Sequence, residues 1–433
     1  MSRLRGWAKH HLPPGLQARA TLGRELLRHR LYRPAHLAAW LRGALGPGPA
    51  RSHERAEARR ELLAWLGRAQ DACQGGGVAG WYALASGWAP GYPETTGYII
   101  VTMLDAAARD GRPRDRERAR RMAKWEVQVQ LPEGGWQGGF VTDLRRPIVF
   151  NTGQVLQGLL AAHAAFGDPT FAAAAERGAA WLVSVQDPDG AWRRHTYQEA
   201  PHAYSTRVAW PLAALAVQAG DRRMREAARR NLDWTLRQQE SDGWFRYSGF
   251  GPDEPAFTHT IAYTLEGLIE AADVLREERY LEAGQRAAEV LFLRFERRGR
   301  LAGSYQPGWK GDDSFACLTG AAQLGRVWTR LFDLTGDARY LNAALKINDQ
   351  VLAAVRWRSH HPGIRGGVPG SLPLSGAYMR FRFPSWAVKF ALDALLAEER
   401  SLARLARRAA PRQGDDPEAA DMAILAGGIG GSA

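Results

Sequence analysis

The chain has 433 residues and a formal net charge of +13, with 45% hydrophobic and 24% charged residues. These proportions are typical of a folded globular protein and exclude a wholly disordered chain. Two cysteines, Cys73 and Cys317, are too few for a disulfide framework or a zinc cluster built from thiolates. The sequence shows neither a transmembrane run nor the apolar core of a secretory signal, so we expect a cytoplasmic protein.

Positive charge is concentrated near the N-terminus. Residues 1–50 hold nine Lys or Arg and a single acidic residue, Glu25, whereas the charge of the remainder is nearly balanced. This distribution predicts a basic N-terminal arm and argues against nucleic acid as the partner. The arm either packs on the rest of the protein or makes peripheral contact with an anionic membrane or a protein partner. For residues 401–433 we expect a disordered C-terminal tail, because most of that segment is Gly, Ala, Pro and acidic residues without a period.

One short pattern recurs in the chain: a helical apolar period that ends in Gln and is followed by Gly and Trp. It occurs at 123–136, 177–192 and 228–244, and a degenerate copy occurs at 62–81. Recurrence of this kind indicates a fold built from repeated units.

Helical segments of two kinds alternate along the chain, and the copies of the pattern lie in one of the two kinds. Six segments are apolar around most of their circumference, which indicates buried inner helices beginning near residues 94, 151, 204, 259, 319 and 386. Six others are amphipathic, which indicates outer helices at 57–70, 114–130, 169–186, 222–239, 277–296 and 337–356.

Loop lengths indicate how these helices are arranged. Connections from inner to outer helices are short and carry an Asp that can cap the next helix, whereas connections from outer to inner helices are long. In a ring of helical hairpins, all long loops lie on the rim where the inner helices begin, and function concentrates on long loops. We therefore predict an all-α protein, an (α/α)6 toroid of six helical hairpins over residues 51–400, with its site on that rim.

The repeated segment RGAAWLVSVQDPDGAW at 177–192 resembles the Gln-Trp repeat of squalene and hopene cyclases and their prenyltransferase relatives. Similar Gly-Trp turns occur in carbohydrate-active toroids, among them unsaturated glucuronyl hydrolases, uronate lyases and glucuronyl C5-epimerases. Both resemblances imply the six-hairpin α/α toroid. In the cyclases the repeat is structural, so the resemblance leaves the chemistry open.

The motifs of terpenoid chemistry are missing from the sequence. No Asp-x-Asp-Asp acid and no Asp-Asp-x-x-Asp diphosphate motif occurs, and Asp187-Pro188-Asp189-Gly190 lacks the terminal acidic pair. The run from Asp312 to Cys317 resembles a prenyltransferase zinc site only superficially, because one Cys without a matched His is a weak metal signal. We expect no metal and no obligatory organic cofactor.

The predicted rim carries polar and aromatic side chains that suit a sugar. The candidate catalytic residues are Glu94, Asn151, His202, Tyr204, Arg207, His259 and Asp313. The candidate substrate-binding residues are Tyr92, Tyr263, Trp309, Asp312, Tyr378 and Arg380. Trp136, Trp192 and Trp244 stand at the same level, where each is expected to wedge neighbouring hairpins.

Proton chemistry on a uronic acid needs a group that neutralises the carboxylate, a base and an acid. Asn151 and Arg207 are candidates for the first role, His202 or His259 for the second, and Tyr204 or Tyr263 for the third. In the alternative interpretation, His202 and Tyr204 only satisfy buried backbone groups. A glycoside hydrolase would instead need two carboxylates, for which Glu94 and Asp313 are the candidate pair.

The sequence therefore favours a carbohydrate-active enzyme that processes an acidic, uronate-containing oligosaccharide or polysaccharide. Lyase or epimerase chemistry is slightly favoured over hydrolysis, and a link to exopolysaccharide metabolism is a further expectation. Two alternatives stay open: a terpene-cyclase-like or prenyl-binding toroid, and a glycan-binding partner without catalytic activity.

Overall fold

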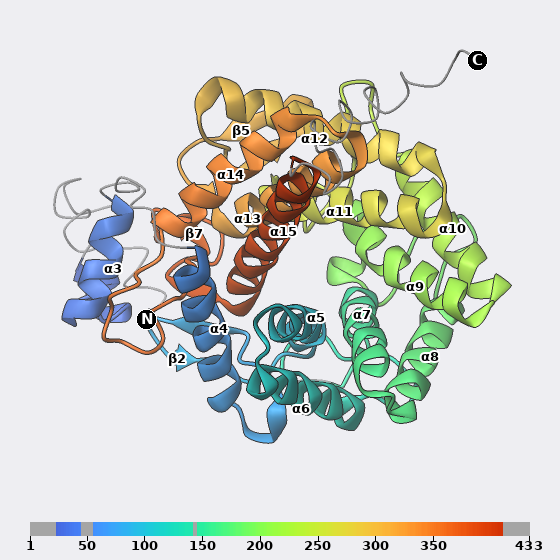
Figure 1. Cartoon of the computed structure of the whole chain (residues 1–433), viewed down its shortest axis with the longest axis horizontal. Helices are drawn as coiled ribbons and strands as arrows, with labels where there is room; N and C mark the ends of the chain where they lie inside the picture. Colours follow the sequence, from blue (N-terminus) through green and yellow to red (C-terminus); the bar gives the residue numbers. More distant parts are fainter. Residues whose placement is uncertain (1–22, 45–54, 142–144, 410–433) are drawn as a thin grey trace, which may run out of the picture.

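The computed structural model describes residues 23–44, 55–141 and 145–409, and Figure 1 shows that they form a ring of helices. The six outer helices are α4 (Arg55–Asp71), α6 (Pro113–Val129), α8 (Pro169–Ser184), α10 (Arg222–Leu236), α12 (Glu278–Arg298) and α14 (Ala338–Ala353). The six inner helices are α5 (Pro93–Asp110), α7 (Val149–Phe166), α9 (Thr206–Ala219), α11 (Thr258–Leu275), α13 (Leu318–Thr335) and α15 (Ser385–Ala409). The predicted (α/α)6 toroid is confirmed, and each inner helix begins within two residues of its predicted start.

The last helix of the toroid packs against the first two, and this contact closes the ring. Each inner helix packs on the next, from α5 through α7, α9, α11 and α13 to α15, and α15 packs back on α5. Five hairpins pair an inner helix with the outer helix that follows it in sequence. The sixth pairs the last inner helix, α15, with the first outer helix, α4, and an ion pair of 2.7 Å joins Arg55 to Glu398 across it.

Short turns link each inner helix to the next outer helix. In the α9 to α10 turn, Gly220 has a φ of 67°, a conformation that glycine adopts without strain, and Asp221 caps α10 by accepting a hydrogen bond of 2.9 Å from the backbone N–H of Met224. Asp168 and Asp337 cap α8 and α14 in the same way. Because these turns are tight, the long loops all lie at the other ends of the helices.

The long loops fold into small antiparallel sheets and 3₁₀ turns that the helical periods do not reveal. One sheet joins the two ends of the toroid in the order β2 (Gly87–Trp88), β1 (Trp81–Ala83) and β8 (Arg382–Pro384). The other strands are β3 (Ala256–Phe257), β4 (Ser304–Gln306) and β5 (Lys310–Asp312) in one sheet, and β6 (Ala316–Cys317) and β7 (Ser371–Leu372) in another. The 3₁₀ turns are η1 (Gln74–Gly76), η2 (Tyr197–Glu199), η3 (Ala203–Ser205) and η4 (Pro307–Trp309).

The repeated Gln and Trp residues connect neighbouring outer helices. The Gln186 side chain donates hydrogen bonds to Gly190 O in its own turn (3.1 Å) and to Ala227 O of α10 (2.8 Å). Gln130 and Gln239 make the equivalent pairs of bonds to their own turns and to α8 and α12. Trp136 and Trp192 are buried and donate to the carbonyl ten residues earlier in the preceding helix. These contacts give the pattern a structural role.

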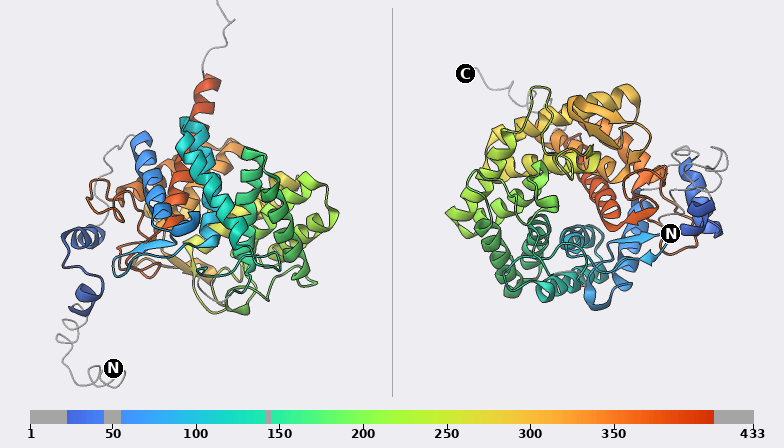
Figure 2. Two further views of the ribbon diagram at one scale, coloured as in Figure 1. Left: turned by 90° about the horizontal axis from the view of Figure 1, so that it is seen from below. Right: turned by 180° about the vertical axis from the view of Figure 1, so that it is seen from behind.

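The described part of the N-terminal segment packs on the ring, which is one of the two alternatives for the arm, and helix α15 extends into the expected tail. Residues 23–44, which include α3 (Pro34–Ala44), lie outside the ring in Figure 1, but Leu31 and His36 are buried against it. At the other end α15 continues as helix through residues 401–409, and Figure 2 shows it projecting beyond the neighbouring helices on the face away from the long loops. The rest of the expected tail and residues 1–22 lie outside the described part.

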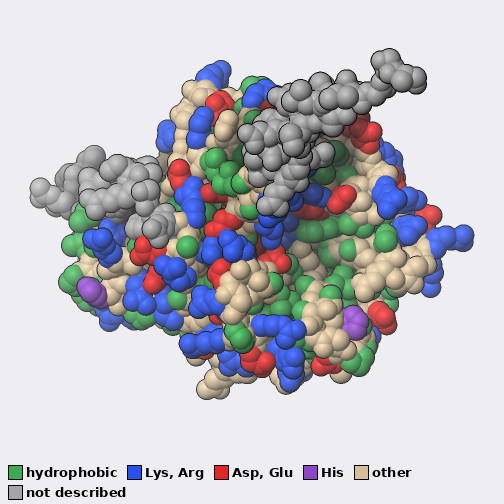
Figure 3. All heavy atoms as spheres, in the orientation of Figure 1, with side chains coloured by type: hydrophobic (Ala, Val, Ile, Leu, Met, Phe, Trp, Pro, Cys, Tyr) green, Lys and Arg blue, Asp and Glu red, His purple; other side chains and the backbone are tan. Residues whose placement is uncertain are grey.

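Charges are mixed over the face of the ring that Figure 3 shows, where basic and acidic side chains lie next to one another. Ion pairs also join neighbouring helices of the ring, such as Arg330 with Asp273 (2.7 Å) and Lys346 with Glu296 (2.9 Å). Of the helices in the described ranges, none is both long and apolar enough to cross a bilayer.

Candidate functional site

A cavity of about 680 Å³ opens on the rim where the inner helices begin. Its walls come from the first turns of α5, α7, α11 and α15, from η3 in front of α9, and from the long loops between them. Eight of the sequence-predicted residues line it: Tyr92, Glu94, Asn151, His202, Tyr204, His259, Tyr263 and Tyr378. The ring therefore brings residues from widely separated parts of the sequence to one depression.

Among the described residues that line this cavity, Glu94 is the single carboxylate. It lies in the first turn of α5, directly after Pro93, and its Oε2 accepts a hydrogen bond of 2.8 Å from the Tyr92 hydroxyl. Burial raises the pKa of Glu94 to about 7, and the Tyr92 hydrogen bond and the charge of Arg207 only partly offset that rise. The group can thus both accept and donate a proton near neutral pH.

His259 faces the cavity in a neutral form. Burial lowers the pKa of His259 to about 4, and its Nδ1 lies 2.6 Å from Gln323 Oε1 on α13. Since a carbonyl oxygen accepts, this contact assigns the proton to Nδ1 and leaves a lone pair on Nε2. The ring packs against Tyr263 and Tyr378, with centroid distances of 4.3 and 5.3 Å.

His202 lies in the same wall, but both of its ring nitrogens face backbone carbonyls. Nδ1 is 3.2 Å from Gly249 O and Nε2 is 2.9 Å from Tyr197 O. The ring stacks on Tyr204 at 4.5 Å, and burial lowers the pKa of His202. These contacts match the alternative in which His202 satisfies backbone groups, so His259 is the better placed of the two imidazoles for chemistry.

Tyr204 presents a hydroxyl that makes no hydrogen bond to a described residue. Its ring packs edge-on against Phe150 at 5.3 Å and also contacts Phe250 at 6.1 Å. Burial and the neighbouring Glu94 raise the pKa of Tyr204 well above its usual range, so the hydroxyl stays protonated at neutral pH. Tyr204 can therefore donate a hydrogen bond or a proton to a molecule in the cavity.

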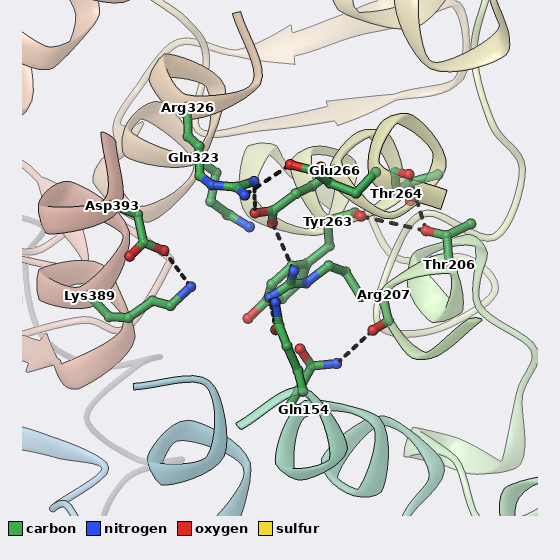
Figure 4. Close-up of polar contacts among 12 residues, drawn as sticks. Gln154, Thr206, Arg207, Tyr263, Thr264, Glu266, Gln323, Arg326, Lys389 and Asp393 are labelled. Carbon is green, nitrogen blue, oxygen red and sulfur yellow. Dashed lines mark hydrogen bonds and ion pairs between the residues drawn. The ribbon is translucent and has the colours of Figure 1, made fainter. Parts of the chain in front are cut away.

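Arg207 lies behind the cavity wall and is not part of its lining. Its side chain is 0% exposed, and its guanidinium lies 3.5 Å from Glu266 of α11 and over the ring of Tyr263. Figure 4 shows Glu266 between Arg207 and Arg326, which it meets at 2.5 Å. The arginine is thus held by a buried carboxylate rather than presented to a ligand.

Four other sequence-predicted residues do not line the cavity either. Asp313 forms an ion pair of 2.6 Å with Arg298, and the Asp312 carboxylate accepts from the backbone N–H of Ser314. Trp309 is buried and donates to Asp242 O, as a wedge between hairpins does. Arg380 pairs with Glu25 at 3.2 Å. The expected carboxylate pair of Glu94 and Asp313 is not brought together in one wall.

The cavity also contains residues that the sequence did not single out. Trp81, Phe140 and Trp386 form an aromatic group beside Tyr92, with Trp81 and Trp386 in the lining. Arg146 also lies in the lining, where it pairs with Glu199. In the sequence, Arg146 could have been found from its position in the long loop just before α7. Trp81 could have been found from its place in the degenerate first copy of the repeat.

A metal site is not evident in the described ranges. No three His, Cys, Asp or Glu side chains of residues 23–44, 55–141 and 145–409 come together in a way that could hold an ion. The cavity instead combines aromatic walls, one carboxyl group, one free imidazole nitrogen and several hydroxyls.

The sequence matches the model of the squalene-hopene cyclase C-terminal domain over residues 92–265. No curated protein matches the chain significantly by sequence.

Solved structures share the architecture at low sequence identity. An unsaturated glucuronyl hydrolase specific for heparin is 14% identical, with a TM-score of 0.65 over 82% of this chain and 98% of that one. An unsaturated glucuronyl hydrolase from Bacillus sp. GL1 is 15% identical, with a TM-score of 0.63 over 80% of this chain and 97% of that one. Cellobiose 2-epimerase from Spirochaeta thermophila is 15% identical, with a TM-score of 0.62 over 81% and 98%. The chain therefore shares the six-hairpin α/α-toroid fold with these proteins.

Proposed function

We propose that this protein is a carbohydrate-active enzyme that moves a proton at a uronate residue of an acidic oligosaccharide or polysaccharide. The observation that carries the proposal is Glu94, a carboxyl group with a pKa of about 7 in an aromatic cavity. A general acid or base works best when its pKa lies near the working pH. The fold shared with sugar hydrolases and epimerases supports a sugar as the substrate.

The walls of the cavity suit a pyranose ring. Trp81, Trp386 and Tyr378 offer aromatic faces for the apolar face of a sugar, and hydroxyl groups beside them can bond its oxygens. Arg146 is the cation in the described part of the lining, and its pair with Glu199 is exposed to solvent. In the proposed complex the sugar carboxylate replaces Glu199 as its partner, which makes the proton on the neighbouring carbon more acidic.

In the proposed reaction, ionised Glu94 removes the proton from the carbon next to the carboxylate. In an elimination, Tyr204 then gives its hydroxyl proton to the departing oxygen as the carbon–oxygen bond breaks and a carbon–carbon double bond forms. In an epimerisation, Tyr204 returns a proton to the opposite face of the same carbon. In both cases proton exchange with solvent returns Glu94 and Tyr204 to their starting protonation states. Neutral His259 accepts a hydrogen bond from a sugar hydroxyl.

Hydrolysis by two carboxylates is less well supported. The part of the lining that the structure describes has no second carboxylate beside Glu94, and Asp313 is held by Arg298 outside the cavity. The geometry thus favours lyase or epimerase chemistry, as the sequence did.

A second candidate is a prenyl-binding or terpene-cyclase-like function, which the match to the cyclase domain and the aromatic walls favour. Against it, a carboxyl group with a pKa of about 7 is too weak an acid to protonate an alkene. A glycan-binding protein without activity, associated with exopolysaccharide assembly, is the third candidate. It would bind the sugar and leave it unchanged.

The test is an assay with oligouronides, neutral oligosaccharides and prenyl chains of comparable size. A lyase gives ultraviolet absorbance of an unsaturated uronate, an epimerase gives uptake of deuterium from solvent, and a hydrolase gives new reducing ends without absorbance. We expect one of the first two signals, with a rate that rises as Glu94 ionises near pH 7.

Three variants connect the signal to the cavity. Glu94→Gln should abolish turnover, and Tyr204→Phe should lower it by about a hundredfold or more while binding persists. Glu240→Gln, on an exposed loop residue, is the matched control and should be fully active. Normal activity in both cavity variants, or tight binding of prenyl chains with no binding of uronides, contradicts the proposal.

A further inference from the structure

The cavity wall that carries Trp81 continues outward into a group of arginines. Strand β8 pairs with β1, and this pairing places the Arg382 guanidinium over the Trp81 ring, 4.9 Å from its centroid. Trp81 itself lines the cavity, as do Tyr378 and Met379 just before β8. We call Arg28, Arg380 and Arg382 the arginine shelf.

The N-terminal segment supplies the third member of the shelf. His29 stacks on Phe381 at 4.0 Å, so the turn that carries Arg28 lies directly on the segment that carries Arg380 and Arg382. Burial is the largest cause of the lowered pKa of His29, and the positive charges of the three arginines lower that pKa further. Two parts of the chain far apart in sequence thus converge to form one positive surface.

The acidic side chains of the described residues do not balance this surface. Glu25 is the acidic residue beside it, and that carboxylate is shared by Arg380 (3.2 Å) and His29 (3.3 Å). Within the described ranges no carboxylate pairs with Arg28 or Arg382. Burial and the charge of Arg28 lower the pKa of Arg382, as expected for a partly buried cation near another cation.

Elsewhere on the molecule arginines are paired across helices, such as Arg279 with Asp233 and Arg330 with Asp273. Like charges held together without counter-charges repel one another, and an anion between them removes that cost. The shelf adjoins the cavity through a shared tryptophan, so an anion there can belong to the same molecule as a group inside the cavity.

We propose that the arginine shelf is a binding subsite for the carboxylates of an acidic oligosaccharide whose reacting residue occupies the cavity and whose chain crosses Trp81. This inference rests on the proposed function and deepens it. The substrate is a polyanion longer than the cavity, and the N-terminal segment is part of its binding site. Guanidinium groups suit this task because they pair with carboxylates through two parallel hydrogen bonds.

The experiment is calorimetric titration of the full chain with digalacturonate, hexagalacturonate and neutral maltohexaose. Hexagalacturonate should bind at least about tenfold more tightly than the dimer, and added salt should remove that advantage. Arg28→Gln and Arg382→Gln should each weaken binding of the hexamer about tenfold and leave binding of the dimer unchanged. Arg223→Gln, an exposed arginine on α10, removes the same charge and should change neither.

The outcomes separate this inference from the proposed function. Equal affinity for dimer and hexamer, or an unchanged hexamer affinity in Arg28→Gln, overturns the subsite, while turnover of the dimer keeps the proposed function. If neither the dimer nor the hexamer is bound or turned over, the proposed function itself is overturned. Binding to phosphatidylserine vesicles that Arg28→Gln and Arg382→Gln abolish, without an effect on the hexamer, makes the shelf a membrane contact and also overturns the subsite.

Discussion

Glu126 on α6 is fully enclosed by protein, and neither of its carboxyl oxygens has a hydrogen-bond partner. Burial raises the pKa of Glu126 well above its usual range. The folded protein therefore keeps a proton that the unfolded chain releases at neutral pH. Because the folded state binds more protons than the unfolded state, the stability contributed by this group falls as pH rises from the unfolded pKa toward the folded pKa.

Replacement of Glu126 by Gln removes this pH dependence. We expect Glu126→Gln to be more stable than the original protein at neutral pH, with a difference in the free energy of unfolding that grows by up to about 1.4 kcal/mol per pH unit. Urea unfolding at a series of pH values measures it. Glu117→Gln, on the exposed side of the same helix, is the control, and equal slopes for both variants would contradict the burial of an unpaired carboxyl group.

Arg207 and Glu266 illustrate a second property at this scale, the dependence of one buried charge on another. Arg207→Ala leaves Glu266 with Arg326 as its remaining cation and should lower the free energy of unfolding by about 3 kcal/mol. Arg330→Ala, at the more exposed end of the same group of charges, should cost less than about 1 kcal/mol. Chemical denaturation of both variants provides the comparison, and similar losses would show that burial does not control the cost.

At the scale of the elements, the repeated Gln side chains hold each outer helix to the next. Gln186→Ala removes hydrogen bonds to two carbonyl groups, one in its own turn and one on α10, and should lower the free energy of unfolding by about 2 kcal/mol. The exposed Gln128 of α6 makes no such bond, so Gln128→Ala serves as its control. Thermal and urea unfolding report the loss, and binding at the cavity should not change.

The helices could be predicted from the sequence, and the strands could not. A helix of about 18 residues, such as α7, repeats its apolar period often enough to be recognised and placed within two residues. Strand β1 has three residues and pairs with β8 at the other end of the toroid, so no local period marks it. For the same reason Glu94 could be predicted, because it lies at the start of a helix. The place of Trp81 in the cavity could not, because it reaches the cavity through the pairing of two short strands.

The direction in which each side chain points around its helix axis could not be predicted from the sequence either. Tyr204 lies in η3 and Arg207 in the first turn of α9, directly after it, and the sequence predicted both in the cavity. Tyr204 faces it, whereas Arg207 turns toward Glu266 on α11. Which side of an apolar helix meets the ring axis depends on packing between helices, and one sequence does not record it.

At the scale of the whole molecule, the N-terminal segment behaves as part of the folded body. Leu31 is 1% exposed and belongs to the main core, whereas Leu27 on the same segment is 72% exposed. Leu31→Ala should therefore lower the free energy of unfolding by about 3 kcal/mol, and Leu27→Ala should leave it nearly unchanged. If denaturation midpoints of the two variants coincide, the segment does not pack on the ring in solution.

The closing hairpin of α4 and α15 has a further consequence for the order of the sequence. Since the first outer helix completes the last inner one, the ring has no structural beginning, and its two ends meet where Arg55 contacts Glu398. A circularly permuted gene could join these ends through a linker and open the chain at the turn between Gly220 and Asp221. Such a permutant should fold to the same ring, because every loop on the cavity rim would remain uncut.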